Sequence, residues 1–333
     1  MRYFGSKTST LDPLEKLITE RIPGGSFCDC FGGVGTVGAK FKALGFRVVT
    51  GDMLLFAHYF QVARVQQDGE LEFLRLRAAH KLGGSHEVAT YLNGLVPSDG
   101  WIVAEYARNR SFFTVENAMR IQACWNSIVE WDRSNLLTGD ERATLIASLI
   151  ERADRVANTA GTYYAFLKNF TRKALQSFEF QLLKPTPGLH RCSAFLGDAE
   201  CLVEREEYDV LYLDPPYNGR VYSRYYHLPE TLAHGEVPSE LSGKAGLPVG
   251  EKQFSAFNRR RTALDALDIL LRKARFRLLV FHYADDGLIE PGELRERFGR
   301  FRRFDEYLLT SKGYSVQRTS RTVDHRVYLI ENG

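Results

Sequence analysis

Residues 208–217 constrain the fold of this chain more than any other stretch. They begin with a short apolar run, Val210–Leu213, which is typical of a buried parallel strand. The run leads directly into Asp214-Pro215-Pro216-Tyr217. Because proline has no N–H and fixes its backbone angle, the strand must stop at Asp214 and continue as a rigid loop. Ligands bind beyond the carboxyl ends of strands in open α/β sheets, so Asp214 and Tyr217 are expected at the mouth of such a crevice.

The loop carries chemistry suited to an aminopurine. A carboxylate and the carbonyls of a stiff turn accept hydrogen bonds, and an amine is their natural donor. An aromatic ring beside them offers a stacking face. Asp214, Pro215, Pro216 and Tyr217 resemble the signature of amino-group DNA methyltransferases, most closely the Dam-like (D12) adenine class. Taken alone, the tetrapeptide is also compatible with an ordinary Pro-Pro turn capped by an aspartate.

A glycine cluster follows the first expected strand, at residues 26–30. Glycines allow close approach of the backbone to a ligand, and a helix expected from Thr36 would supply free N–H groups. Residues 45–52 are expected to form the next strand, and its last residue, Asp52, can accept both hydroxyls of a ribose. Residues Gly33 to Gly38 also match the pattern G-x-G-x-x-G, which is typical of dinucleotide-binding loops. The glycine cluster alone is therefore also compatible with a nicotinamide dehydrogenase, or with a turn that binds no ligand.

The lead-in Asp29-x-Phe31-x-Gly33-x-Gly35 resembles the S-adenosylmethionine loop of methyltransferases. This resemblance implies S-adenosylmethionine as the cofactor, with Asp29 near its amino-acid end. It also implies that Asp198, after a third strand at residues 192–196, binds the adenine ring of the cofactor. No metal is expected. The complete set of expected cofactor contacts is Tyr3, Lys7, Asp29, Phe31, Gly33, Gly35, Asp52, Asp198 and Ala199.

Composition narrows the class of protein. Of 333 residues, 44% are hydrophobic and 26% are charged, as in globular proteins that do not span membranes. No apolar run is long enough to cross a bilayer and the first residues lack a signal-peptide core, so we expect a cytoplasmic protein without a membrane partner. The net charge of +3 is compatible with nucleic acid but is no evidence for it. Cys28 and Cys30 are expected to be small core residues and not metal ligands.

The alternation of strands and helices stops after Asp52. Residues 55–183 are mostly helical in pattern and contain no internal repeat. The Dam-like class carries a helical target recognition domain at this point. We therefore expect a discontinuous catalytic domain of residues 1–58 plus 185–333, and a helical insertion of residues 59–184. The order of glycine loop, insertion and D-P-P-Y loop is the circular arrangement called alpha.

The expected fold is an α/β, Rossmann-like S-adenosylmethionine-dependent methyltransferase sheet with a mostly helical inserted domain. Residues 304–310 and 326–331 are expected to close the sheet as an antiparallel hairpin, joined by a polar loop that contains Arg318 and Arg321.

Two groups of polar residues are candidates for DNA contact. Lysine and arginine can bind phosphates, and asparagine or arginine can read base edges. Solvated helix faces are the plain alternative. Residues 234–252, punctuated by glycine and proline, are expected to be a mobile loop at the DNA face. The candidate DNA-binding residues are Lys168, Asn169, Arg172 and Lys173 within the insertion, and Arg220, Tyr222 and Arg224 after the catalytic loop.

The mechanism expected is direct methyl transfer to the N6 amine of adenine. Asp214 and the Pro215 carbonyl would hold the amine, and Asp214 would offset developing positive charge. The base must be flipped out of double-stranded DNA, with Tyr217 stacking on it.

A partner restriction endonuclease and a monomeric state are expected. The open alternatives are a structured RNA substrate, methylation of the cytosine amine, a nicotinamide-dependent dehydrogenase and a non-catalytic nucleic-acid-binding module.

Overall fold

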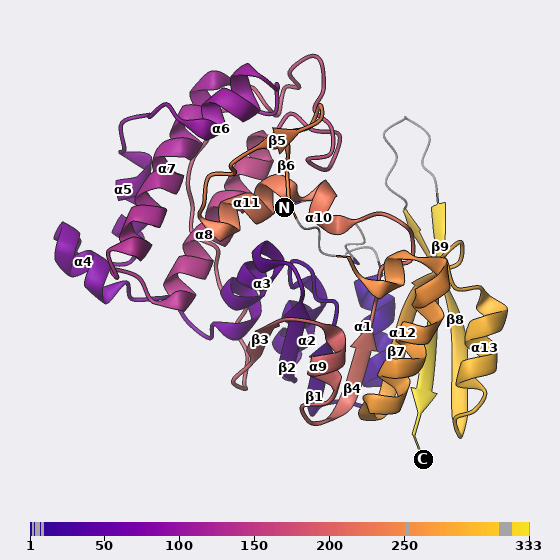
Figure 1. Cartoon of the computed structure of the whole chain (residues 1–333). Coiled ribbons are helices and arrows are strands. Elements are labelled where there is room, and N and C mark those ends of the chain that lie inside the picture. The colour runs from indigo at the N-terminus through magenta and orange to yellow at the C-terminus, as the bar shows by residue number, and fades with distance from the viewer. Residues whose placement is uncertain (2, 4–6, 8–9, 251–253, 313–321, 333) are drawn as a thin grey trace. The chain divides into compact units, whose positions relative to one another are not determined.

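The computed structural model describes residues 1, 3, 7, 10–250, 254–312 and 322–332 (Figure 1). The chain forms two compact units, which we call the sheet unit and the helical unit. The sheet unit consists of Gly5–Gln61, Thr186–Tyr222 and Gln253–Gly333. The helical unit consists of Met1–Phe4, Val62–Pro185 and Ser223–Lys252. Arg318 and Arg321 of the expected polar loop lie outside the described residues.

A seven-stranded sheet forms the centre of the sheet unit, in the order β3-β2-β1-β4-β7-β9-β8. The first five strands in this order are parallel, and β9 pairs antiparallel with both β7 and β8. The predicted fold class, with its closing hairpin, is confirmed. The strands are β1 (Ser26–Asp29), β2 (Arg47–Asp52), β3 (Ser193–Leu196), β4 (Glu207–Leu213), β7 (Arg275–Ala284), β8 (Arg303–Lys312) and β9 (Thr322–Glu331).

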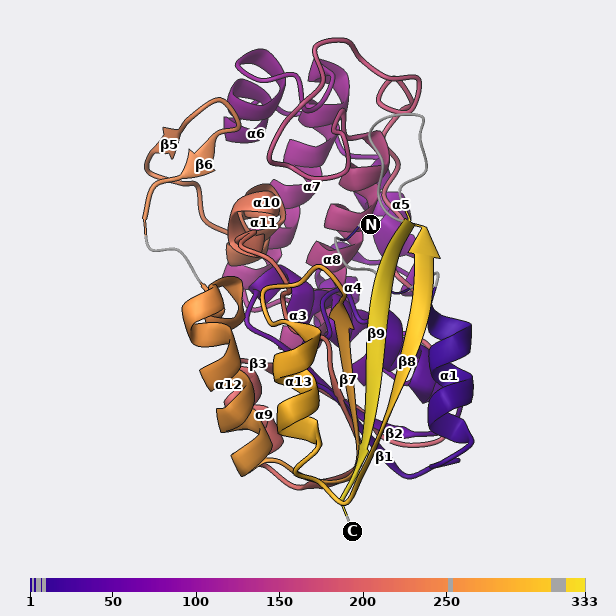
Figure 2. The same cartoon turned by 90° about the vertical axis from the view of Figure 1, so that its right-hand side faces the viewer.

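Amphipathic helices cover both faces of this sheet, as Figure 2 shows for α1 on one face and α12 and α13 on the other. In α12 the apolar positions recur at helical spacing, so they form one apolar face of the helix. This face is buried against β4 and β7. Cys28 and Cys30 lie in the same core cluster, as predicted. The helices are α1 (Leu11–Thr19), α2 (Thr36–Ala43), α3 (Leu55–Gln61), α9 (Ala199–Val203), η3 (Ala256–Asn258), α12 (Arg260–Lys273) and α13 (Pro291–Phe298).

The carboxyl ends of the parallel strands present acidic side chains at one edge of the sheet. Strand β1 ends at Asp29, β2 ends at Asp52, and β4 ends one residue before Asp214. Strand β3 ends two residues before Asp198. Because these strands run in the same direction, their ends meet at the edge where open α/β sheets bind ligands.

The helical unit is organised around two long helices, α7 (Val115–Arg133) and α8 (Gly139–Val156). Thr138 and Glu141 form a reciprocal capping box that fixes the start of α8. No helix in the described ranges is long and apolar enough to cross a membrane. The other helical segments are η1 (Val62–Gln66), α4 (Leu74–His80), α5 (His86–Asn93), α6 (Trp101–Val103), η2 (Ala104–Arg108), α10 (Tyr222–Tyr225, whose first residue is counted in the sheet unit) and α11 (His227–His234).

Two features of the helical unit were not anticipated. Residues 223–252, which we expected in the catalytic portion, cluster with the helices. Within them, β5 (Leu241–Ser242) and β6 (Leu247–Pro248) form a small antiparallel pair where only a loop was expected. The Tyr106 hydroxyl donates to the Gly246 carbonyl at 2.7 Å and anchors this pair.

Candidate active site and nucleic-acid surface

Asp214 makes an ion pair with Lys7 directly after β4. Lys7 Nζ lies 2.6 Å from Asp214 Oδ2, and both side chains are largely buried. The other oxygen, Oδ1, is also buried and accepts no hydrogen bond from the described part of the chain. Burial raises the pKa of Asp214, and the neighbouring Lys7 ammonium opposes that rise. One carboxylate oxygen is thus fixed by the protein, and the other is available to a donor from a ligand.

The loop between β1 and α2 depends on glycine. Gly33 and Gly35 adopt positive φ angles of 49° and 75°, where side chains are strained. The Gly33 N–H donates to Asp52 Oδ2 at 3.0 Å, and the Gln61 amide donates to the Gly33 carbonyl at 3.0 Å. Helix α2 begins directly after Gly35. The loop is therefore held in shape by the end of β2 and by α3, with the N-terminus of a helix behind it.

Asp29 is a buried carboxylate in an acidic environment. Neither of its oxygens forms a hydrogen bond with the described residues. Burial, followed by the charges of Asp214 and Asp52, raises the pKa of Asp29 to about 8, and nearby backbone N–H groups oppose this only in part. A ligand that brings positive charge to this position would relieve the repulsion. The site thus suits a cationic ligand.

Asp52, Asp198 and Ala199 are three further residues that we expected to contact the cofactor. Asp52 already accepts the N–H groups of Gly33 and Leu54, at 3.0 and 2.9 Å. Asp198 is exposed and precedes α9, without capping that helix through its side chain. Ala199 packs partly against the core.

Phe31 and Tyr3, the two aromatic residues among the expected cofactor contacts, pack against other aromatic side chains. The Phe31 ring packs edge-on against Phe257, with ring centroids 5.6 Å apart. Tyr3 belongs to the helical unit, where its ring stacks on that of Tyr226 with centroids 4.9 Å apart.

Tyr217 is held on several sides within the sheet unit. Its carbonyl accepts a hydrogen bond from the Leu288 N–H at 2.9 Å. The rings of Tyr283 and His325 both meet the Tyr217 ring nearly at right angles, with centroids 6.2 and 5.9 Å away. Lys7 Nζ lies 5.9 Å from the centroid of the Tyr217 ring. Sequence patterns did not single out His325, because a histidine alternating with apolar residues in an edge hairpin carries no distinctive signal.

The loop beyond Tyr217 is fixed by a residue that sequence reasoning also missed. The side-chain amide of Asn258 donates to the carbonyls of Asn218 and Arg220, at 3.1 and 2.9 Å. The Arg220 side chain remains exposed. Tyr222 lies in the same unit and is half-buried.

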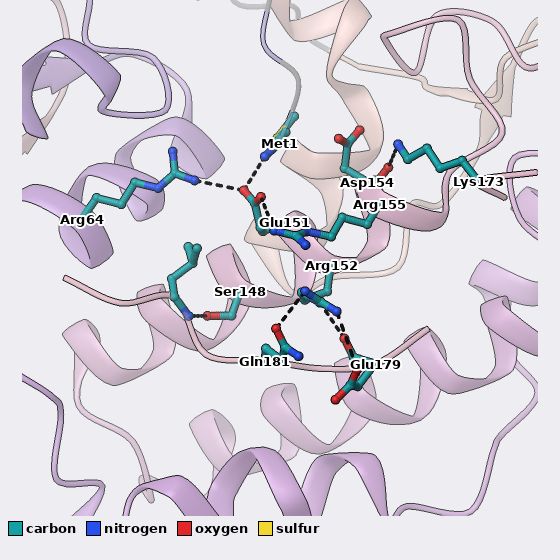
Figure 3. A network of polar contacts seen from close by, with 11 residues as sticks. Met1, Arg64, Ser148, Glu151, Arg152, Asp154, Arg155, Lys173, Glu179 and Gln181 are labelled. Atoms are coloured by element: carbon teal, nitrogen blue, oxygen red, sulfur yellow. Dashed lines mark hydrogen bonds and ion pairs between the residues drawn. The ribbon is translucent and has the colours of Figure 1, made fainter. Parts of the chain in front are cut away.

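The candidate DNA-binding residues of the insertion fall into two groups. Lys168, Asn169 and Arg172 are exposed. Lys173 is half-buried, and its ammonium donates to the carbonyl of Asp154 on α8 (Figure 3). Lys173 therefore has a structural contact, and the part of the chain that the structure describes gives none to Lys168, Asn169 or Arg172.

Two buried asparagines shape the irregular segment that carries these residues. The Asn158 amide donates to the carbonyls of Ser111 and Leu167, and its oxygen accepts from the Thr171 N–H at 3.1 Å. Asn117 binds the backbone of residues 174–178 in the same way. An irregular segment needs such partners, because its buried backbone groups have no ladder to join.

Helix α8 extends this support along the segment. Arg152 donates to the Glu179 carbonyl at 2.7 Å, and Ser148 Oγ accepts from the Leu183 N–H at 2.9 Å (Figure 3). On the same helix, Glu151 lies between the Met1 amine and Arg64, and Arg64 donates to it at 3.0 Å. Residues 158–183 are therefore a fixed segment on which the polar side chains of Lys168, Asn169 and Arg172 are exposed.

Arg224 lies in the helical unit and contacts a pair of tyrosines. Tyr164 and Tyr225 stack with centroids 4.7 Å apart, and the Arg224 guanidinium lies 5.9 Å from the Tyr164 ring. Tyr164 is 43% exposed. Stacked rings beside a cation form a surface suited to nucleic acid.

Comparison with known proteins agrees with this geometry. Residues 3–263 match the model of the D12 class N6 adenine-specific DNA methyltransferases. The type II methyltransferase M.NlaIII of Neisseria lactamica is 32% identical over 96% of this chain and 94% of its own length. The type II methyltransferase M.FokI of Planomicrobium okeanokoites is 32% identical over 88% of this chain, and the modification methylase StsI of Streptococcus sanguinis is 31% identical over 88%. The chain spans about half the length of M.FokI and StsI, at 46% and 45%.

A methyltransferase family of this kind implies S-adenosylmethionine as methyl donor in general. The chain belongs to the family of D12 class N6 adenine-specific DNA methyltransferases.

Proposed function

We propose that this chain transfers a methyl group from S-adenosylmethionine to the N6 amine of adenine, at a specific sequence in double-stranded DNA. The observation that carries the proposal is the state of Asp214. Its Oδ2 is fixed by Lys7, while its buried Oδ1 accepts no hydrogen bond from the described residues. A buried acceptor without a donor is costly, and an amine from the substrate would satisfy it.

The amine of adenine is a poor nucleophile because its lone pair is delocalised into the ring. Hydrogen bonds from that amine to Asp214 Oδ1 and to the Pro215 carbonyl favour a tetrahedral nitrogen with a localised lone pair. The two prolines keep both acceptors in place, so little reorganisation is needed at the moment of transfer. The Asp214 charge also offsets the positive charge that develops on the nitrogen.

The cofactor residues fit a ligand with a cationic end. S-adenosylmethionine supplies an electrophilic methyl group on a positively charged sulfur. The Gly33–Gly35 loop admits close approach of its backbone, and the buried Asp29 carboxyl would become a negative partner for the amino-acid portion once the positive charge of the ligand lowers its pKa. Asp52, at the end of β2, would accept the ribose hydroxyls. Asp198 and Ala199 would meet the adenine ring of the cofactor.

The substrate base must leave the duplex to reach Asp214, which costs a few kcal/mol. Tyr217 would stack on the flipped adenine. Binding of the duplex is assigned to the exposed residues of the helical unit, Lys168, Asn169 and Arg172, together with Arg224. Arg220 and Tyr222 would contact the strand near the flipped base.

Two of the named relatives are called type II methyltransferases and one is called a modification methylase. These names support a partner restriction endonuclease with the same recognition sequence. Protection of DNA against that nuclease, when the chain is expressed in a methylation-deficient host, tests this part.

The test of the activity uses purified protein, labelled S-adenosylmethionine and unmethylated DNA or RNA, followed by identification of the modified nucleoside. The expected product is N6-methyladenine from duplex DNA, and sequencing of the methylated DNA gives the recognition site. Asp214→Ala should lower transfer by about 10³-fold with cofactor affinity nearly unchanged. Asp265→Ala, an exposed carboxylate on α12, is the matched control. Labelled N4-methylcytosine, labelled RNA alone, or an active Asp214→Ala variant that no longer binds cofactor would contradict the proposal.

A further inference from the structure

Three side chains from neighbouring strands form a row on one face of the sheet. Tyr212 of β4 pairs in register with Val280 of β7, so His282, two residues further on, points to the same face. His282 pairs in register with Val327 of β9, and His325 is two residues before it. The strand register therefore aligns Tyr212, His282 and His325.

This row is connected by direct contacts that end at Tyr217. The Tyr212 hydroxyl and His282 Nδ1 are 2.9 Å apart. The rings of His282 and His325 meet at 86° with centroids 5.1 Å apart, and His325 meets Tyr217 at 90° and 5.9 Å. Perpendicular contacts between rings at these distances are favourable. The row thus connects the interior of the sheet with the aromatic residue of the D-P-P-Y loop.

Both histidines are buried and uncharged at neutral pH. His282 is fully buried and His325 is 6% exposed. Burial, with a contribution from the Lys7 charge, lowers the pKa of His282 well below its ordinary value and that of His325 to about 4. Neutral rings can pack beside the Lys7–Asp214 pair without adding charge to it.

The backbone of Tyr217 and its ring are fixed by different contacts. The prolines and the hydrogen bond from Leu288 restrain the backbone, but they leave the ring free to rotate about its side-chain bonds. His325 and Tyr283 are the perpendicular partners of that ring. Tyr283 also packs in the core on the opposite face of the sheet, so the two contacts come from different faces.

We propose that His325, supported by His282 and Tyr212, is a positioning residue that holds the Tyr217 ring in the orientation needed to capture a flipped adenine. This inference rests on the proposed function, in which Tyr217 stacks on the base. A ring already held in place loses less conformational freedom when the base arrives. His325 itself acts through Tyr217 and not on the substrate.

The test compares His325→Ala, His325→Phe and His325→Asn on duplexes that contain the recognition site found by sequencing. With a normally paired target adenine, His325→Ala should lower kcat/KM about three- to tenfold, in line with the strength of aromatic pairs. His325→Phe keeps a ring and should restore most of the rate, whereas His325→Asn keeps hydrogen-bonding capacity without a ring and should not. Cofactor affinity should stay within about twofold in all three, as expected when no group of the cofactor site is altered.

A second substrate separates positioning from general damage to the fold. In a duplex with a mismatch opposite the target adenine, flipping costs less and the flipped base is already populated in the bound complex, so the defect of His325→Ala in the single-turnover rate at saturating DNA should largely disappear. A defect of equal size on both duplexes would overturn the proposal, as would wild-type kinetics of His325→Ala or rescue by asparagine in place of phenylalanine. If the wild-type protein itself methylates no adenine, the proposed function fails and not this inference alone.

Discussion

Lys7 Nζ lies 2.6 Å from Asp214 Oδ2 in a buried ion pair that links the N-terminal segment to the D-P-P-Y loop. A buried carboxylate is unstable as an anion unless a cation or a set of donors compensates it. Here the cation comes from a residue that we expected to bind cofactor. The Lys7 ammonium favours the charged form of Asp214 and fixes the orientation of that carboxylate, which leaves Oδ1 for the substrate amine.

Replacing Lys7 with methionine should alter the pH dependence of methyl transfer. Without the cation, the pKa of Asp214, already raised by burial, should rise further. Because a carboxyl group is charged only above its pKa, the single-turnover rate should fall at neutral pH and recover as the pH increases. Lys7→Arg keeps a cation and is the control. Parallel pH profiles for wild type and Lys7→Met would contradict this role.

Binding of S-adenosylmethionine should release a proton from Asp29. Its pKa of about 8 means that the free carboxyl is mostly protonated at pH 7, and a cationic ligand lowers that pKa. The affinity should therefore rise with pH up to about 8 and then level off. Titration calorimetry in buffers of different ionisation enthalpy measures the released protons. Asp29→Asn should remove this release, and equal release from wild type and variant would count against it.

The sequence was informative wherever a local pattern reflects a single constraint. Apolar runs that end at Asp29, Asp52 and Asp214 located three parallel strands, because a buried strand needs a continuous apolar stretch. Because these strands are parallel, their carboxyl ends lie at the same edge of the sheet. The positions of most site residues along the sheet edge were thus predictable.

Contacts between residues distant in sequence were not predictable. Nothing near Lys7 indicates that its ammonium reaches Asp214, since the contact depends on how separate segments pack. His325 reaches Tyr217 only through the register of β9 against β7. Residues 157–192 contain no helix, although the pattern of residues 55–183 was mostly helical, and backbone contacts to Asn117 and Asn158 take the place of helical hydrogen bonds there.

Asn158→Ala should unfold the helical unit more easily and weaken DNA binding. Asn158 is fully buried, and its loss leaves the Thr171 N–H and the carbonyls of Ser111 and Leu167 without this partner. We expect a decrease of about 1–3 kcal/mol in the free energy of unfolding. Asn169→Ala, at an exposed asparagine of the same segment, should change stability by less than about 0.5 kcal/mol. Chemical denaturation and DNA titration measure both effects, and a loss of cofactor affinity equal to the loss of DNA affinity would argue against a local role.

Arg172 and Lys173 are adjacent in sequence but should respond differently to substitution. If the exposed Arg172 neutralises one DNA phosphate, Arg172→Ala should reduce the slope of log K against log salt concentration by about 1. Lys173 donates to the Asp154 carbonyl, so Lys173→Met should leave the slope unchanged and instead lower the free energy of unfolding by about 1 kcal/mol. Fluorescence anisotropy at several salt concentrations, with denaturation of the same samples, measures the two quantities. A reduced slope for Lys173→Met together with an unchanged slope for Arg172→Ala would show that the lysine leaves its carbonyl to bind phosphate, and that the arginine does not contact DNA.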